Sequence, residues 1–403
     1  MRESAIKSQV TSSRVLPAWV KSVACGAIAV GLLGTAIGLV TGRSDEIWWM
    51  LLVNFLFWTG VAQGAFIWAA ILRTAQATWA AGVNRLAHAF VGFLPFSLLL
   101  YAVLYVGRHH WLTWLRHPVP EKAAWLNAPF FFLRDGMALA LMTALSYLLV
   151  AWYRKGEAAL QTGEGDLHRA HSRANKLATL LVILYAVLYS LIAFDMVMSL
   201  EPHWTSTLFG GLFFVGNLYA GVALLILVAA VVREPLGLTD YLGKRQFIDL
   251  GNLMLGFNIF YTGLVFAHNL TIWYGNLPGE VVYLIPRVYQ YPWRAVAWFL
   301  LVACFLIPFF VLQFEEVKGS PRRLCPIAVL VLFSMWVQRW MMVVPAFSPH
   351  RLAGLTPLAW CIPVLCAGMM LWVVATSLAR NPQVSSLDLA LRLDGVGAAK
   401  CPD

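Results

Sequence analysis

The chain has 403 residues, of which 60% are hydrophobic and only 12% carry a charged side chain. A soluble domain carries roughly 25% charged residues, so water is excluded as the main solvent of this chain. The formal net charge is +10, but the basic residues do not gather in one stripe, which argues against nucleic acid as a partner. The composition predicts an all-α polytopic membrane protein.

Ten apolar runs are each long enough to cross a hydrocarbon core roughly 30 Å thick. They predict one transmembrane domain at residues 19–378, with polar tails at residues 1–18 and 379–403. The N-terminal tail has no cleavage-like site of small residues and is predicted to be retained. The predicted spans are Trp19–Val40, Trp48–Leu72, Leu86–Val106, Phe130–Trp152, Leu177–Met198, Leu208–Val232, Leu250–Trp273, Ala295–Phe314, Leu324–Pro345 and Leu355–Ser377.

Lys and Arg residues are divided unevenly between the two sets of predicted loops. The two tails and the loops on their side hold 20 of them, whereas the other set of loops holds 7. Because cytoplasmic loops are enriched in Lys and Arg, both tails are predicted to lie in the cytoplasm. The same excess suits contact with anionic lipid on that side.

The sequence predicts no resident redox centre. Its six cysteines are scattered, without a CxxC or CxxCH pattern, which argues against iron-sulfur, zinc and c-type haem sites. A b-type haem needs two histidines at matched depth, but His88 and His268 are predicted in opposite halves of the membrane. Electron transfer would therefore require a diffusible carrier and a metal-containing partner.

Polar side chains inside the predicted spans mark candidate sites, because a charge at mid-membrane costs about 2.5 to 3.5 kcal/mol. A quinol head group needs a proton acceptor at each hydroxyl and hydrogen-bond donors for the carbonyls of its oxidised form. Asp195 and His268 are the candidate acceptors, and Arg339 is a candidate donor. The side chains predicted to converge on one pocket near the outer face are Asn54, Arg134, Asp135, Asp195, His268, Gln338 and Arg339.

A second polar group is predicted in the cytoplasmic half of the membrane. Most of its members lie within a turn or two of the interface, where snorkelling and helix capping explain them. A chain of His88, Asp249, Asn258 and Asp195 is an alternative, as a proton path that links the two faces. The other members of this group are Arg73, Asn252, Glu315 and Glu316.

The second and sixth predicted spans echo each other weakly. The stretch Asn54–Gly60, followed by Gly64, is similar to Gly210–Asn217, followed by Gly221. Small residues at helical spacing allow helices to approach closely, so packing is the simpler interpretation. A repeated bundle is the alternative.

Four segments carry a family resemblance. They are Ala193–Phe209, which contains Asp195, Glu201 and His203; Asp249–Leu255; Leu270–Glu280; and Lys122–Asn127, with Phe131 and Arg134 just beyond it. These segments resemble the NrfD/PsrC superfamily, and most of all the second NrfD-like membrane subunit of alternative complex III, a quinol:cytochrome c oxidoreductase.

The resemblance implies two four-helix bundles plus two further helices, in a bacterial inner membrane. It implies a diffusible quinol, menaquinone or ubiquinone, that is oxidised near the periplasmic face, with electrons passed to a periplasmic iron-sulfur subunit and coupling to proton translocation. A multihaem cytochrome c and other membrane subunits are the further partners that it implies. The candidate quinone-binding residues are then Asn54, Arg134, Asp135, His203 and Arg339.

Two positions depart from the family pattern. His268 stands where a neutral polar residue is usual, and it adds a proton acceptor. Gly279 precedes a single Glu280 where paired carboxylates are usual, which weakens this loop as a charged docking site.

Three functions stay open at this point. The first is a quinol-binding subunit of a respiratory complex, and the second is a scaffold or proton-conducting subunit that binds no quinol. The third is the membrane anchor of a polysulfide or molybdopterin-type reductase. A secondary transporter is less favoured, because Pro95, Pro308 and Pro363 do not fall in corresponding halves of the chain.

Overall fold

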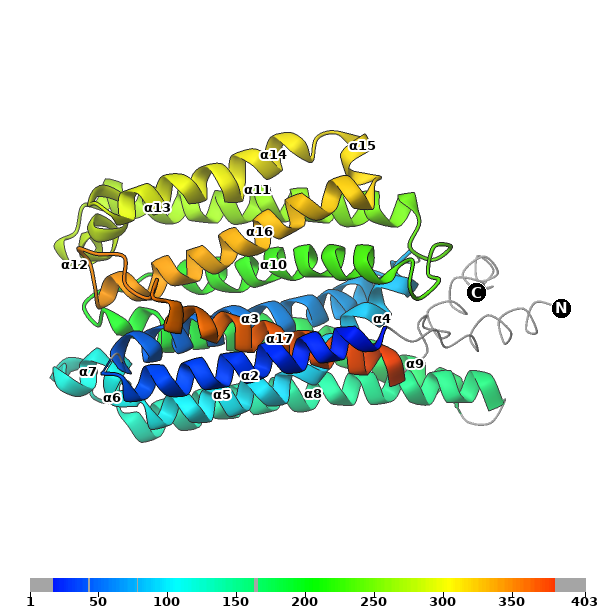
Figure 1. The fold of residues 1–403 in the computed structure, drawn as a ribbon, viewed down its shortest axis with the longest axis horizontal. Helices are drawn as coiled ribbons and strands as arrows, with labels where there is room; N and C mark the ends of the chain where they lie inside the picture. The colour runs from blue at the N-terminus through cyan, green and yellow to red at the C-terminus, as the bar shows by residue number, and fades with distance from the viewer. Residues whose placement is uncertain (1–16, 43, 78, 163–165, 381–403) are drawn as a thin grey trace, which may run out of the picture.

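The computed structural model describes residues 17–42, 44–77, 79–162 and 166–380, and Figure 1 shows them as a bundle of roughly aligned helices. These ranges contain no β-strand. Within them, ten helical segments are long and apolar enough to cross a membrane. The predicted all-α polytopic fold is therefore confirmed. The predicted tails, residues 1–18 and 379–403, lie almost entirely outside the described residues.

The ten spans follow the predicted apolar runs in order. The first five are α2 (Ala18–Val40), α3 (Ser44–Thr74), α4 with η1 and α5 (Ala81–Ala89, Phe90–Phe93, Leu94–Val106), α8 (Ala128–Thr162) and α9 (Leu167–Met196). The other five are α10 (Phe209–Val232), α11 (Lys244–Gly275), α13 with η5 and α14 (Trp293–Leu300, Leu301–Leu306, Ile307–Val311), α16 (Pro321–Val343) and α17 (Pro357–Arg380). The short connecting elements are α6 (Arg108–Trp111), α7 (Thr113–Arg116), η2 (Pro120–Lys122), η3 (Met198–Leu200), α12 (Pro278–Leu284), η4 (Ile285–Tyr289), α15 (Glu315–Lys318) and η6 (Val344–Ala346).

Two spans are interrupted just before a proline. The third span changes to a 3₁₀ turn before Pro95, and the eighth changes to a π-helical turn before Pro308. Proline has no backbone N–H to donate, and its ring clashes with the preceding turn. The local change of helix type accommodates the proline without ending the span.

Helices α8 and α9 are longer than the predicted spans. α8 ends at Thr162 and α9 begins at Leu167, so each extends ten residues beyond the predicted boundary at Trp152 or Leu177. The side chain of Asp166 caps α9 by accepting a hydrogen bond from the backbone N–H of Arg169 at 2.7 Å. The extension carries charged side chains, which a search for apolar runs does not detect. Figure 1 shows the two helices projecting past their neighbours.

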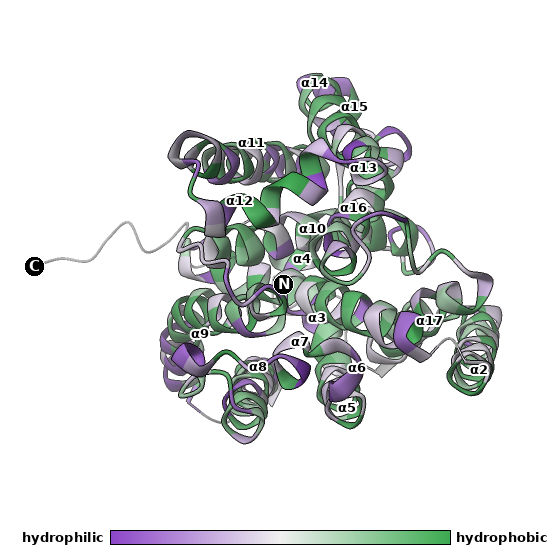
Figure 2. Cartoon of the chain, turned by 90° about the vertical axis from the view of Figure 1, so that its left-hand side faces the viewer, coloured by the Kyte–Doolittle hydropathy of each residue, from purple (hydrophilic) through white to green (hydrophobic). Residues whose placement is uncertain are grey.

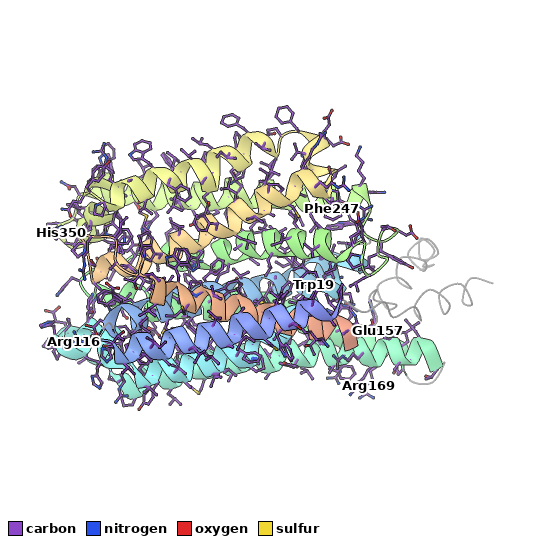
Figure 3. All side chains as sticks on the ribbon, in the orientation of Figure 1. Trp19, Arg116, Glu157, Arg169, Phe247 and His350 are labelled. Carbon is purple, nitrogen blue, oxygen red and sulfur yellow. The ribbon has the colours of Figure 1, made fainter. Side chains whose placement is uncertain are left out.

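The two ends of the bundle differ in charge. We call the end where α2 begins and α17 ends the basic end, because most of the described Lys and Arg residues lie there. Figure 3 places Trp19, Phe247 and Arg169 at this end, and Arg116 and His350 at the other, which we call the opposite end.

The eight central spans form two four-helix bundles. In the first bundle, α3, α4 to α5, α8 and α9 pack in a ring, and in the second, α10, α11, α13 to α14 and α16 do the same. α3 and α10 are buried along most of their length and join the bundles at a common seam. The pair α2 and α17 packs on the outside, next to α3, as the end-on view in Figure 2 shows.

The seam depends on a close approach of the α3 and α10 backbones. A Cβ atom on Gly64 would lie 2.3 Å from the carbonyl oxygen of Asn217, and one on Gly221 would lie 2.6 Å from the backbone nitrogen of Ala65. Trp68 fixes the register by donating from Nε1 to the carbonyl oxygen of Leu218 at 2.9 Å. Gly64 and Gly221, which belong to the sequence echo, therefore serve packing at this seam.

We expect Gly221→Val to destabilise the protein, because its branched side chain has no room at the seam. Overpacking costs typically about 1 to 3 kcal/mol. The measurement is the thermal unfolding midpoint of the purified protein in detergent. Gly211→Val on the same helix is the control, since a Cβ at Gly211 meets nothing within 4 Å. Equal unfolding midpoints for the two variants would contradict the close approach of α3 and α10 at Gly221.

Candidate functional site

The polar residues predicted at one depth form two groups, one in each bundle. Asp195 and Arg134 belong to the first bundle, whereas His268 and Arg339 belong to the second. Among the described residues, no hydrogen bond joins Asp195 to His268 or to Arg339. The structure thus presents two sites where the sequence analysis expects one shared pocket.

The first site is the Asp195 cluster, which consists of Asp195, Arg134, Asp135 and Trp125. Arg134 binds Asp195 with two donors, Nε to Oδ2 at 2.5 Å and Nη2 to Oδ1 at 2.6 Å. The indole Nε1 of Trp125 donates to Asp195 Oδ1 at 2.9 Å, and the Trp125 ring lies 3.9 Å from the Arg134 guanidinium carbon. Bidentate Arg-carboxylate pairs are among the strongest charge-assisted contacts, so this cluster ties α8 to α9.

Asp135 is the unsatisfied member of the cluster. Its carboxyl lies beside that of Asp195, it is fully buried, and neither oxygen receives a hydrogen bond from a described residue. One guanidinium can balance only one carboxylate. The second carboxyl is therefore a place where the cluster can hold a proton.

The second site is a cavity of about 480 Å³, the second-bundle cavity, between α11, α12, α13 and α16. Its walls are mostly aliphatic and aromatic, and the exposed rings of Trp298 and Tyr289 lie at its rim. None of the described side chains that line it is acidic. The polar side chains that line it are Tyr261, Thr262, His268, Asn269, Tyr283, Arg287, Tyr289, Arg294 and Gln338.

His268 is held in a fixed orientation at this cavity. Its Nδ1 lies 3.1 Å from the hydroxyl of Ser206, and its ring packs edge-on against Trp204 and Tyr283. The other ring nitrogen, Nε2, is buried and has no hydrogen-bond partner among the described residues. A buried, unsatisfied nitrogen in a cavity wall is an unmet hydrogen-bond requirement that a ligand can fill.

Arg339 lies behind the cavity wall and does not line it. Its Nη2 donates to Asn217 Oδ1 at 2.7 Å and to the carbonyl oxygen of Phe213 at 3.1 Å. Its Nη1 donates to the Oε1 of Gln338 at 3.1 Å. Gln338 itself lines the cavity, so Arg339 influences the cavity through its hydrogen bond to Gln338.

Arg287 lies outside the predicted spans, between Trp273 and Ala295, yet it is buried at the cavity. It pairs with Glu201 at 2.7 Å and donates to the carbonyl oxygens of Met341 and Met342 at 3.1 and 3.0 Å. Its guanidinium also lies over the ring of Tyr283 at 3.8 Å, and burial raises the pKa of Tyr283. Arg287 thus joins η4 to the end of α16.

Two other predicted quinone-binding residues lie away from the cavity. Asn54 is buried between helices, where its Oδ1 accepts from the indoles of Trp58 and Trp336, both at 3.2 Å. His203 is exposed in the corner between α9 and α10. Neither lines the second-bundle cavity.

The residues of the predicted proton path lie in both bundles. His88, in the first bundle, packs edge-on against Tyr153, with the ring centroids 4.5 Å apart. Neither nitrogen of the His88 ring has a hydrogen-bond partner among the described residues. Asn258, in the second bundle, donates to the hydroxyl of Tyr219 and the carbonyl oxygen of Cys304, both at 2.8 Å. Asp249 is half-buried on α11. No described contact links these residues into a continuous path.

At the basic end, the predicted capping residues pair locally. Arg73 is buried and donates from Nε to Asn175 Oδ1 at 2.7 Å, while Asn252 accepts from Lys318 at 2.7 Å. Glu315 and Glu316 form exposed pairs with Lys244 and Arg323, at 3.6 and 3.3 Å. Local pairs of this kind agree with a structural role, snorkelling or helix capping, for these polar residues.

No group of three or more His, Cys, Asp or Glu side chains in the described ranges could hold a metal ion. The chain is a multi-pass α-helical membrane protein whose second bundle contains a mostly apolar cavity that several polar side chains also line. No protein-family model and no curated protein matches the sequence.

We expect Arg134→Met to destabilise the protein strongly, because it leaves the buried Asp195 carboxylate unpaired. Breaking a buried ion pair by removing one partner costs about 3 to 5 kcal/mol. The double variant Arg134→Met with Asp195→Leu removes both charges, and we expect it to recover much of that loss. The measurement is unfolding by denaturing detergent.

Lys244→Met is the matched control, because both Lys244 and its partner Glu315 are exposed and such pairs contribute less than about 1 kcal/mol. If Arg134→Met were no more destabilising than Lys244→Met, the Asp195 cluster would not be a structural tie.

Proposed function

We propose that this chain is the quinol-binding membrane subunit of a bacterial respiratory electron-transfer complex, of the quinol:cytochrome c oxidoreductase type. The observation that carries the proposal is the second-bundle cavity, whose mostly apolar wall includes a fixed His268 with a buried Nε2 that has no described hydrogen-bond partner. In this proposal the chain belongs to the NrfD/PsrC superfamily, and its partners are a periplasmic iron-sulfur subunit, a multihaem cytochrome c and further membrane subunits.

The size and composition of the cavity suit a quinone ring. Its volume of about 480 Å³ lies within the range of roughly 300 to 1,000 Å³ of small-molecule sites. The Tyr261 hydroxyl is a second buried polar group without a described hydrogen-bond partner. The exposed rim residue Trp298 belongs to a membrane span, so a lipid-soluble ligand could enter from the bilayer.

The chemistry assigned to this chain is proton handling. Oxidation of a quinol to a quinone releases two electrons and two protons. His268 Nε2 would accept one proton, with Ser206 at Nδ1 holding the imidazole in position, and the second proton would pass to water at the cavity rim. The electrons would pass to the iron-sulfur partner at the opposite end. Asp195 has no place at this cavity, since its carboxylate is engaged by Arg134 and Trp125.

The alternative is a scaffold or proton-conducting subunit that binds no quinol. The observation that favours it is Asp135, a buried carboxyl without a described donor next to Asp195. Under this alternative the Asp195 cluster holds a transferable proton in the first bundle, and lipid fills the second-bundle cavity. The anchor of a polysulfide or molybdopterin-type reductase would use the same cavity for quinone with a different partner.

We expect His268→Ala in the assembled complex to lower quinol turnover by about 10²-fold or more, the usual contribution of a general base. The measurement is quinol oxidation by the purified complex, with bound quinone quantified by extraction. His350→Ala, an exposed histidine at the opposite end (Figure 3), should turn over like the parent. Unchanged turnover in His268→Ala would favour the scaffold alternative.

The proposed orientation places the basic end and both termini in the cytoplasm. We expect Arg169→Cys, at the tip of α8 and α9, to resist a membrane-impermeant maleimide in intact cells, and His350→Cys to react. Both positions are exposed and lie at different ends (Figure 3). The measurement is labelling before and after lysis in a background without the native cysteines. The reverse pattern would invert the orientation.

A further inference from the structure

The polar side chains that line the second-bundle cavity include an amide whose orientation is fixed. Gln338 Oε1 accepts a hydrogen bond from Arg339 Nη1 at 3.1 Å. A guanidinium has donors only, so the amide cannot be reversed without bringing two donors together. The Nε2 group of Gln338 therefore faces away from Arg339, and no described residue accepts a hydrogen bond from it.

Arg339 is itself anchored from α10. Asn217 Oδ1 and the carbonyl oxygen of Phe213 accept from its Nη2, and the Phe213 ring lies 4.0 Å from the guanidinium carbon. The side chain is 1% exposed. Gly216 leaves the space for this arrangement, because a Cβ there would lie 3.3 Å from Arg339 Nη2 and 3.0 Å from the Tyr261 ring. The amide of Gln338 is thus held by a rigid support.

Gln338 and His268 are two of the nine polar side chains that line the cavity, and they differ in kind. Gln338 presents a donor and no free acceptor, since its oxygen is occupied by Arg339. His268 Nε2 presents a titratable nitrogen, and no acidic side chain lines the space among the described residues. A carbonyl oxygen satisfies the Gln338 donor. A hydroxyl oxygen can accept the same hydrogen bond, but its own hydrogen finds no acceptor on Gln338 and needs one elsewhere in the cavity.

We propose that Gln338, held in place by Arg339, donates a hydrogen bond to one carbonyl oxygen of the bound quinone. This inference rests on the proposed function. Gln338 is then a specificity determinant that contacts the ligand, and Arg339 is a positioning residue. The opposite oxygen of the ring faces His268, and the two ends of the ligand are not equivalent.

The test uses the full-length protein in lipid nanodiscs and a short-chain 1,4-naphthoquinone labelled with ¹³C at one carbonyl or the other. Infrared spectra should show one of the two carbonyl stretches shifted down in the parent protein. In Gln338→Leu that band should return to the position of the unbonded carbonyl. The quinone affinity should fall about three- to tenfold, the equivalent of one net hydrogen bond.

Gln338→Glu provides a second variant of nearly the same size. It presents an acceptor oxygen to the cavity in place of the amide donor, so we expect the quinone-to-quinol affinity ratio to fall below that of the parent protein. A purely structural role for Gln338 would not lower this ratio. Gln313→Leu is the control, because Gln313 is exposed and bonds only to its own helix at Phe309.

The outcomes separate the inference from the proposed function. If the parent protein binds neither naphthoquinone nor its quinol saturably, both the proposed function and the Gln338 inference are overturned. If the parent binds quinone and His268→Leu weakens that binding, but the Gln338 variants leave the carbonyl bands and the quinone-to-quinol affinity ratio unchanged, the Gln338 inference alone is overturned.

Discussion

The close approach of α3 and α10 fixes the position of Asn217, and the polar chemistry of the second bundle depends on that residue. A Cβ on Gly60 would lie 2.3 Å from Asn217 Oδ1, so glycine is required where α3 crosses it. The same oxygen accepts from Arg339 at 2.7 Å, and Arg339 in turn holds Gln338. Backbone packing at the seam between the bundles thereby determines the donor geometry at the wall of the cavity.

Buried arginines inside the spans are stabilised in two ways. In the first bundle, Arg134 pairs with Asp195, and Arg85 lies 3.4 Å from Glu157. In the second, no carboxylate among the described residues pairs with Arg339, which relies on two amides, a backbone carbonyl, the sulfur of Met342 and an aromatic ring. A buried cation that is solvated only by neutral groups favours electron-rich oxygen nearby, because the low dielectric of the interior strengthens such attractions. The second bundle is therefore the better place for a carbonyl ligand.

The sequence predicted the fold well, because apolar length is a direct consequence of the membrane thickness. It underestimated the lengths of α8 and α9, since the charged extensions of these helices beyond the apolar core give no hydropathy signal. For the candidate site, it placed Asp195 and His268 near the same end of the bundle, where both contact the corner between α9 and α10, but it did not predict their neighbours. Spans that are hydrophobic on all sides carry little periodicity to show which way a side chain faces. Arg287 was missed because a loop position gives no indication of burial.

The corner between α9 and α10, residues 197–208, contacts both sites. On the first-bundle side, the hydroxyl of Ser199 donates to the carbonyl oxygen of Asp195. On the other side, Ser206 holds His268, and Trp204 stacks on Tyr283 with ring centroids 3.7 Å apart. A displacement of this corner would therefore move the support of the imidazole and the last turn of α9 together. Because the corner lies at the opposite end and exposes His203, an electron-accepting partner that docks there would meet the same segment that orients the proposed proton acceptor.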